Sequence, residues 1–92
     1  MSDRMAVHVF VEGTVQGVYF RATTRDRAQE HDVNGWVRNL DDGRVEAYFE
    51  GDPDAVEQLV SFCHEGSDRA VVENVEVEQV EPEGYDDFEV RW

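Results

Sequence analysis

The order of apolar and polar residues along the chain predicts strands of period two. Alternation is typical of half-buried strands, and it occurs over residues 6–12, 35–39, 44–50, 71–80 and 88–92. In the first of these segments Val7, Val9 and Val11 fall on one face, which we expect to be buried. In the fourth, Val75 and Val77 are expected to point inward, with the intervening glutamates facing solvent.

Two further segments predict helices. Residues 21–31 carry only a weak apolar stripe, with Phe20, Thr24, Ala28 and His31 expected roughly on one side. The second helix has clear boundaries: Asp52 can cap it, Pro53 suits its first position and Gly66 can end it. An Asp-Gly pair at 42–43 is typical of a tight hairpin between the second and third strands. The order strand, helix, strand, strand, helix, strand predicts an α+β fold, the ferredoxin-like βαββαβ sandwich. Its two helices cover one face of a mainly antiparallel sheet, which here has a short extra C-terminal strand.

Length and composition predict a single domain with an acidic surface. With 92 residues, the chain is expected to form one domain over residues 1–92. It has 22 acidic residues against eight basic ones, all of them arginine, and a formal net charge of −14. Small soluble domains commonly carry a magnitude of about 2–8. Such a surface repels polyanions, so we expect no binding to nucleic acid or to anionic membranes. The 40% of hydrophobic residues argues against disorder.

The acidic surface is best explained by high ambient salt. At 1 M ionic strength the Debye length falls to about 3 Å, and repulsion among carboxylates largely vanishes. We therefore expect a halophilic protein whose melting temperature is lower in dilute buffer than in molar salt. The charge also favours a monomer.

Several side chains are expected to have only structural roles. Cys63 is the one cysteine, which excludes an internal disulfide, and its place in an apolar stripe favours a core thiol. The chain has no apolar stretch of 18 residues and no secretory leader pattern, so the cytoplasm is the expected location. The three histidines, His8, His31 and His64, share no metal-ligand spacing and are expected to lie at or near the surface. Trp36 and Trp92 are expected to pack in the core or at the edge of the sheet.

The segment from Gly13 to Arg21, GTVQGVYFR, joins the first strand to the first helix. Its two glycines allow a tight loop with backbone N–H groups turned inward, and the loop ends at a helix N-terminus. With a guanidinium at the rim, these features predict an anion cradle. The segment matches neither the Walker loop nor the dinucleotide GxGxxG pattern. The alternative is a surface turn shaped by Gly13 and Gly17, with Arg21 paired to an acidic neighbour.

Asn39 ends the second strand, just before the hairpin. Taken alone, an asparagine at such a position usually caps a turn. In the predicted topology the third strand lies between the first two, so Asn39 would approach the loop only across the end of the sheet.

Together, the segments VQGVYFR (15–21) and GWVRN (35–39), followed by DGRVE (42–46), resemble the acylphosphatase family. The resemblance covers nearly the whole chain, including the closing FEVRW. It implies hydrolysis of the carboxyl–phosphate bond of small acyl phosphates, without cofactor, metal or covalent intermediate. Arg21 matches the family's phosphate-binding arginine, and Asn39 matches the asparagine that orients the attacking water. The resemblance implies phosphate-binding backbone donors in the loop residues Val15, Gln16, Gly17, Val18, Tyr19 and Phe20.

Two other functions remain open at this stage. The same fold could serve as a non-catalytic anion-binding or ligand-binding module, or as an accessory domain that handles carbamoyl groups in a larger protein. Asn39 distinguishes the binding module from an enzyme, because a protein that only binds an anion needs no amide to position water. Roles also stay open for Thr14, for Tyr19 and for the Asp41/Asp42 pair, which is either part of a turn or a cation site.

Overall fold

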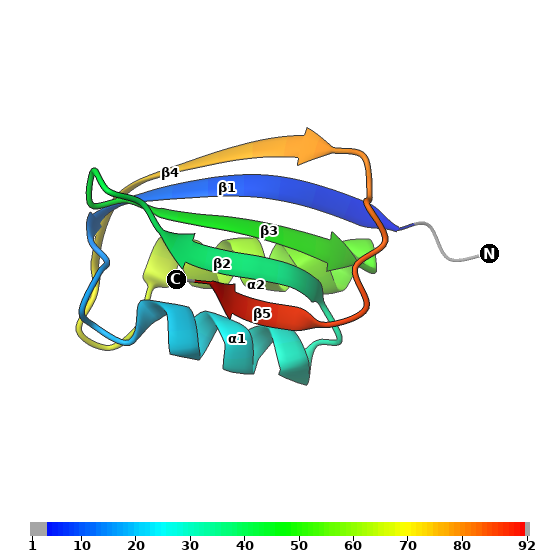
Figure 1. Cartoon of the computed structure of the whole chain (residues 1–92), viewed down its shortest axis with the longest axis horizontal. Helices are drawn as coiled ribbons and strands as arrows, with labels where there is room; N and C mark the ends of the chain where they lie inside the picture. Colours follow the sequence, from blue (N-terminus) through cyan, green and yellow to red (C-terminus); the bar gives the residue numbers. More distant parts are fainter. Residues whose placement is uncertain (1–3, 92) are drawn as a thin grey trace.

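The computed structural model describes residues 4–91 and contains seven elements. In chain order they are β1 (Met5–Thr14), α1 (Phe20–Glu30), β2 (Asn34–Asn39), β3 (Val45–Gly51), α2 (Pro53–Glu65), β4 (Val71–Val80) and β5 (Phe88–Arg91). This order confirms the predicted one (Figure 1). The predicted boundaries hold to within one residue, except that β1 runs two residues further, to Thr14. The prediction for Trp92 lies outside the described residues.

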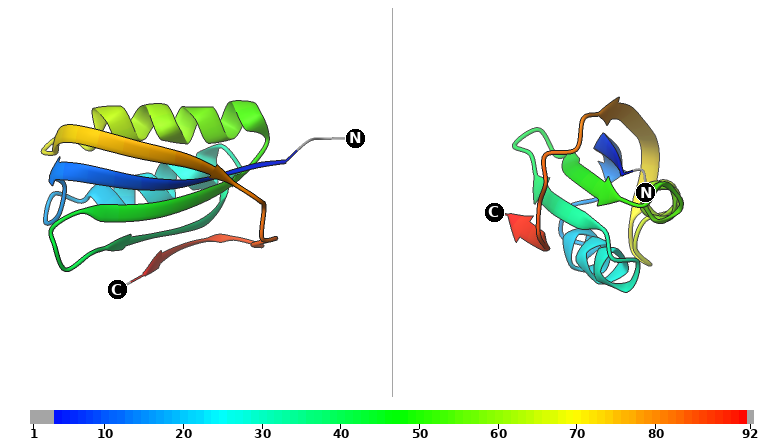
Figure 2. Two further views of the ribbon diagram at one scale, coloured as in Figure 1. Left: turned by 90° about the horizontal axis from the view of Figure 1, so that it is seen from above. Right: turned by 90° about the vertical axis from the view of Figure 1, so that its right-hand side faces the viewer.

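The five strands form one sheet in the order β4-β1-β3-β2-β5. β3 lies between β1 and β2, as predicted, and pairs antiparallel with both. β1 and β4 are also antiparallel, whereas β2 and β5 are parallel. Both helices lie on the same face of the sheet, as the two views of Figure 2 show. The arrangement is the expected ferredoxin-like α+β sandwich.

The main core fills the space between the sheet and the helices. Val7, Val9 and Val11 of β1 are at most 1% exposed, which confirms the predicted inward face. The two helices meet through Phe20 and Phe62, whose ring centroids lie 5.4 Å apart. Other buried members of this core include Val37, Val45, Ala47, Phe49, Val56, Leu59 and Cys63.

Two predictions about buried faces are wrong in part. Val75 packs against the core, and Val77 lies opposite Val9 on the same inward face, but Val77 is 45% exposed. β4 is an edge strand that pairs only with β1, so part of its inward face remains uncovered. On α1, Phe20 and Ala28 are buried as expected, whereas His31 lies just past the helix end and is exposed.

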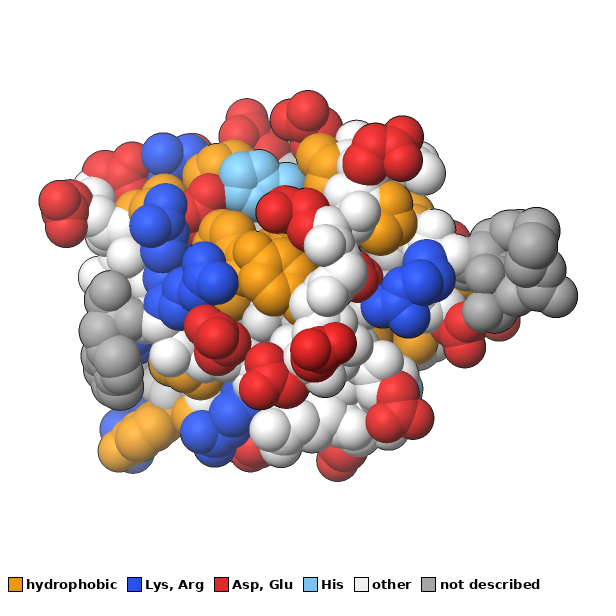
Figure 3. Space-filling view, turned by 45° about the vertical axis from the view of Figure 1, so that its right-hand side comes forward, with side chains coloured by type: hydrophobic (Ala, Val, Ile, Leu, Met, Phe, Trp, Pro, Cys, Tyr) orange, Lys and Arg blue, Asp and Glu red, His pale blue; other side chains and the backbone are white. Residues whose placement is uncertain are grey.

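The other face of the sheet carries no helix, yet part of it is buried. Trp36 stacks on Tyr48, with ring centroids 6.3 Å apart, so Trp36 packs as predicted. Beside these rings lie Glu46, which is 6% exposed, and Glu50, which is fully buried. Figure 3 shows a patch of hydrophobic side chains next to a histidine, with basic and acidic groups around it.

Glu50 holds the connection between β4 and β5 against the sheet. Its carboxylate accepts hydrogen bonds from the Tyr48 hydroxyl at 2.8 Å, from the N–H groups of Glu83 and Gly84, and from the Arg4 guanidinium at 3.0 Å. Burial alone would raise the pKa of Glu50, but these donors outweigh it and lower the pKa below its usual value. The anchored connection carries the chain across the sheet to β5, beside β2.

The loop after β1 and the turn after β2 lie at the same end of the sheet (Figure 1). This follows from the topology, because β1 and β2 both run antiparallel to the strand between them and therefore point the same way. The start of α1 lies at this end as well. The fold thus brings the two sequence segments of interest to one edge of the molecule.

Candidate active site

The loop between β1 and α1 has two residues in the left-handed region of backbone conformation. Gly17 has a φ of 73°, and Tyr19, which occupies the N-cap position of α1, has a φ of 62°. No side chain caps α1 at Tyr19, and the first turn holds no acidic residue. The first N–H groups of a helix need acceptors and carry partial positive charge. This helix start is therefore suited to an anion.

Gly13 fixes where the loop leaves β1. A β-bulge lies between Glu12 and Gly13, whose φ is 129°, and a Cβ added there would come within 2.1 Å of the Val71 carbonyl oxygen. Only glycine allows the backbones of β1 and β4 to approach this closely. The glycine thus sets the direction in which the chain enters the loop.

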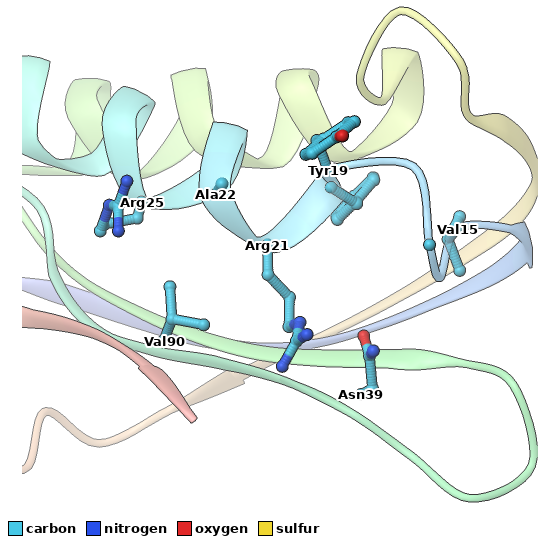
Figure 4. A pocket seen from close by; sticks show the side chains of 9 residues that line it. Val15, Tyr19, Arg21, Ala22, Arg25, Asn39 and Val90 are labelled. Atoms are coloured by element: carbon cyan, nitrogen blue, oxygen red, sulfur yellow. The ribbon is translucent and has the colours of Figure 1, made fainter. Parts of the chain in front are cut away.

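Arg21 and Asn39 come together in one pocket with a volume of about 660 Å³. In Figure 4 the two side chains point toward each other, Arg21 from the first turn of α1 and Asn39 from the end of β2. Arg21 also donates a hydrogen bond to the Arg91 carbonyl oxygen at 3.0 Å, which ties the guanidinium to β5. The described lining residues are Val15, Gly17, Tyr19, Phe20, Arg21, Ala22, Arg25, Asn39 and Val90.

Four of the six predicted loop residues line this pocket. Val15, Gly17, Tyr19 and Phe20 line it, whereas Gln16 and Val18 are not among the described lining residues. The Val18 carbonyl accepts a hydrogen bond from the Ser67 hydroxyl at 2.7 Å, so it faces the segment after α2.

The Gln16 side chain connects the loop to the hairpin instead. Its amide donates to the carbonyl oxygens of Leu40 and Arg44, at 2.7 and 2.9 Å. These two residues flank the turn that directly follows Asn39, so the loop and the end of β2 are joined by one side chain. The sequence pattern contains no signal for this link, because it joins positions 24 and 28 residues apart.

Asn39 has an unusual acceptor. Its Oδ1 atom is buried and receives no hydrogen bond from any residue that the structure describes. A buried acceptor left without a donor costs about 1–3 kcal/mol, so native proteins rarely keep one without a reason. The oxygen has almost no exposed surface, but Asn39 lines the pocket, so a rotation of its carboxamide would bring Oδ1 to a bound water or a ligand.

Three pocket residues were not found by sequence reasoning: Ala22, Arg25 and Val90. Arg25 lies one helical turn beyond Arg21, so helical spacing alone could have placed both on one face of α1. Val90 reaches the pocket from β5, a placement that depends on the parallel pairing of β5 with β2.

The turn after Asn39 is closed by an Asp42–Arg44 pair. Asp42 accepts hydrogen bonds from the Arg44 backbone N–H at 3.1 Å and from its guanidinium at 2.8 Å, and these bonds lower the pKa of Asp42. Asp42 thus stabilises the turn through Arg44. Asp41 is exposed.

Other chemically active side chains lie away from the pocket. Burial raises the pKa of Cys63 to about 12, which makes this thiol a poor nucleophile. His8 contacts Glu46 on the helix-free face. Over residues 4–91, no three His, Cys, Asp or Glu side chains gather as a metal site would need. Within the same range, neither helix is long and apolar enough to span a membrane.

The sequence model of the acylphosphatase family matches residues 7–90. The chain belongs to the acylphosphatase family. An acylphosphatase from Haloarcula marismortui is 74% identical over 86 residues, which is 92% of this chain and 93% of the relative. One from Natronomonas pharaonis is 62% identical over 91 residues and covers 99% of both chains. The structure of an acylphosphatase from Coxiella burnetii matches with a TM-score of 0.93 at 42% identity, over 97% of this chain and 94% of the other.

Membership of the acylphosphatase family confirms the resemblance found in the sequence. It supports an acylphosphatase enzyme, and the non-catalytic binding module is not favoured.

Proposed function

We propose that the protein hydrolyses small acyl phosphates in this pocket, with Arg21 binding the phosphoryl group and Asn39 positioning the attacking water. The observation that carries the proposal is the shared pocket. A guanidinium, an uncapped helix start and a buried carboxamide oxygen without a protein donor among the described residues meet there. An anion binder would need the first two features, whereas the third is suited to holding water.

The phosphoryl oxygens are bound by Arg21 and by backbone N–H groups of the loop. A guanidinium can donate two parallel hydrogen bonds to two oxygens of one phosphoryl group, which lysine cannot do. The amides at the start of α1 add partial positive charge. Because phosphoryl transfer has a loose transition state, positioning and charge neutralisation supply most of the catalysis.

Asn39 accepts a hydrogen bond from water through Oδ1 and holds it in line with the leaving oxygen. The water oxygen forms a bond to phosphorus while the bond from phosphorus to the acyl oxygen breaks. The acyl oxygen leaves with the electron pair as a carboxylate, and the water protons pass to the phosphate product or to solvent. A carboxylate is a good leaving group, so the mechanism requires no metal, no covalent intermediate and no strong general acid.

The proposal extends to the cellular setting. We propose a monomer adapted to high salt, supported by the net charge of −14 and by the relative from Haloarcula marismortui. Location in the cytoplasm, and the absence of nucleic-acid or membrane partners, stay predictions from the sequence.

The first test measures benzoyl phosphate hydrolysis at 0.1 M and 2 M KCl with EDTA present. We expect turnover that EDTA leaves unchanged. Asn39→Ala should lower kcat by about 100-fold, since losing the orientation of a reactant can cost that much. Inhibition by inorganic phosphate should change less than about twofold, because Arg21 and the loop remain.

Arg21→Ala should behave differently, weakening phosphate inhibition about tenfold or more as well as lowering kcat, because it removes a charge-assisted contact. Asn74→Ala, an exposed asparagine on β4, is the matched control and should act as wild type. A wild-type kcat in Asn39→Ala, or unchanged phosphate inhibition in Arg21→Ala, would contradict the assigned roles. Activity that EDTA abolishes would remove the metal-free mechanism.

A further inference from the structure

The loop between β1 and α1, residues 15–19, has a backbone conformation that needs support from outside the loop. φ is positive at Gly17 and at Tyr19, 73° and 62°, and is not positive at Val18 between them. Backbone that alternates in this way turns successive N–H groups into a concave nest for anions. Glycine adopts a positive φ freely, whereas a tyrosine keeps one only where its surroundings impose it. The conformation of Tyr19 therefore points to a contact that holds this part of the loop.

Such a contact comes from the connection between α2 and β4, residues 66–70. The Ser67 hydroxyl donates a hydrogen bond to the Val18 carbonyl oxygen at 2.7 Å, across 49 positions in the sequence. Figure 1 shows this connection, in yellow, beside the loop between β1 and α1, in blue. Neither Ser67 nor Val18 is among the described residues that line the pocket. The hydrogen bond thus reaches the loop from the side that faces away from the pocket.

Ser67 is itself held in place. It is 8% exposed, and its carbonyl oxygen accepts a hydrogen bond from the Ala70 N–H at 2.9 Å, which closes a turn. The residue before it, Gly66, packs against the start of α1, because a Cβ added there would lie 3.6 Å from the Phe20 ring and 2.9 Å from the Ala70 Cβ. The Ser67 hydroxyl is therefore a fixed donor rather than a mobile surface group.

This hydrogen bond sets the direction of the next N–H group. The peptide between Val18 and Tyr19 is planar and trans, so its carbonyl and its N–H point in opposite directions. Because the Val18 carbonyl faces Ser67, the Tyr19 N–H faces away from Ser67, and Tyr19 lines the pocket. Within residues 4–91 this N–H donates no hydrogen bond to another residue. It can therefore donate to an oxygen of a bound anion.

We propose that Ser67 is a positioning residue, whose hydroxyl holds the Val18–Tyr19 peptide so that the Tyr19 N–H points at the phosphoryl group. The proposal rests on the acyl phosphate hydrolysis proposed above, and Ser67 itself does not touch the substrate. A donor that is oriented in advance needs no reorganisation when the phosphoryl group binds and reacts. Without the hydroxyl, the half-buried Val18 carbonyl can turn to solvent, and the Tyr19 N–H turns with it.

The direct test follows the backbone amide protons by NMR while inorganic phosphate is added in molar KCl. In the wild type, phosphate should move the Tyr19 amide proton downfield, because this proton enters a hydrogen bond to a charged acceptor. In Ser67→Ala this movement should be smaller, and the Kd for phosphate should rise about threefold to tenfold, the range for the loss of one hydrogen bond. The kcat/KM for benzoyl phosphate should fall by at least the same factor.

Two further serine variants show whether the hydroxyl itself is responsible. Ser67→Thr keeps a hydroxyl and should restore the Kd for phosphate to within about twofold of the wild type. Ser61→Ala removes a hydroxyl from an exposed position on α2 and is the matched control, which should bind phosphate as the wild type does. If Ser67→Ala does not fold, Ser67→Cys takes its place, because a thiol keeps a similar shape and is a weak donor. Melting temperatures show that each variant is folded.

The failures of the two proposals are distinguishable. If the wild type does not hydrolyse benzoyl phosphate, the proposed function is wrong. If the wild type hydrolyses it, but Ser67→Ala matches the wild type in the Kd for phosphate and in the Tyr19 amide shift, only the role of Ser67 is overturned. A lower melting temperature with unchanged phosphate binding leads to the same conclusion, since Ser67 would then stabilise the fold without orienting the donor. Equal weakening of phosphate binding in Ser61→Ala would also overturn it.

Discussion

At the scale of single residues, two buried hydrogen-bond acceptors have opposite surroundings. Glu50 is fully buried, and its carboxylate is surrounded by donors from Tyr48, Glu83, Gly84 and Arg4. Asn39 Oδ1 is buried too, but receives no donor from the described residues. The first arrangement stabilises the fold, whereas the second is costly for the fold and useful where a ligand or water supplies the donor.

The first prediction concerns Glu50 and pH. Because the folded-state pKa of Glu50 lies below its usual value of 4.5, its ionised form stabilises the protein above that pH. This stabilisation is lost as the pH falls below about 4.5 and through the folded-state pKa. Glu50→Gln should lower the free energy of unfolding by about 1.5–3 kcal/mol at pH 7, the range for hydrogen bonds to charged groups. Urea denaturation in molar KCl measures it.

The difference between wild type and Glu50→Gln should shrink as the pH is lowered from 6 to 3. Glu57→Gln, an exposed carboxyl on α2, controls for the loss of one negative charge and should show little change. A difference that stays constant across this range would show that ionisation of Glu50 does not stabilise the fold.

At the scale of elements, the geometry of the pocket depends on how the β1–α1 loop meets the β2–β3 turn. Gln16 bridges them with two hydrogen bonds, to Leu40 and Arg44. We expect Gln16→Ala to lower kcat for benzoyl phosphate about tenfold, since a shift of about 1 Å in a positioned group can cost up to 100-fold. Phosphate inhibition should change less, because Arg21 and the loop amides are retained.

The control for this prediction is Gln58→Ala, which truncates an exposed glutamine on α2. If Gln16 merely stabilised the fold, Gln16→Ala would lower the melting temperature and leave kcat unchanged well below that temperature. Such a result would remove Gln16 from the positioning of Asn39.

The same scale shows what the sequence can and cannot predict. α2 was predicted to its boundaries, because Pro53 and Gly66 are local signals that act on their own segment. α1 begins one residue earlier than predicted, with Tyr19 in a left-handed conformation that nothing in a tyrosine signals. Val77 is exposed because β4 lies at the edge of the sheet, which depends on the whole strand order.

For the site, the two sequence segments predicted which residues meet but not how they are held. Arg21 and Asn39 were placed at one end of the sheet by topology, and they line one pocket. Three features were not predicted: the Gln16 bridge, the Arg25 side chain in the pocket lining, and the buried Asn39 Oδ1 that has no donor among the described residues. Each of these features depends on packing between segments that are distant in the sequence.

At the scale of the whole molecule, repulsion among like charges opposes folding. A net charge of −14 on 92 residues opposes the compact state through self-repulsion, and salt weakens that repulsion. Three of the 22 acidic residues, Glu73, Glu76 and Glu78, are exposed along the edge strand β4. Charged residues there also prevent edge-to-edge pairing with another sheet. The acidic edge therefore opposes pairing with another sheet, at the cost of stability in dilute buffer.

The last prediction follows from this balance. The melting temperature should rise between 0.1 M and 2 M KCl, since each kcal/mol of relieved repulsion corresponds to about 4–8 °C in a domain of this size. Replacing Glu73, Glu76 and Glu78 together by Gln should raise the melting temperature in dilute buffer and reduce its dependence on salt, because fewer charges remain to be screened. Circular dichroism during heating measures both. Sucrose at equal osmolality serves as the uncharged control, since it stabilises compact states without screening. A melting temperature higher in dilute buffer than in 2 M KCl would show that repulsion among carboxylates does not limit the stability of this fold.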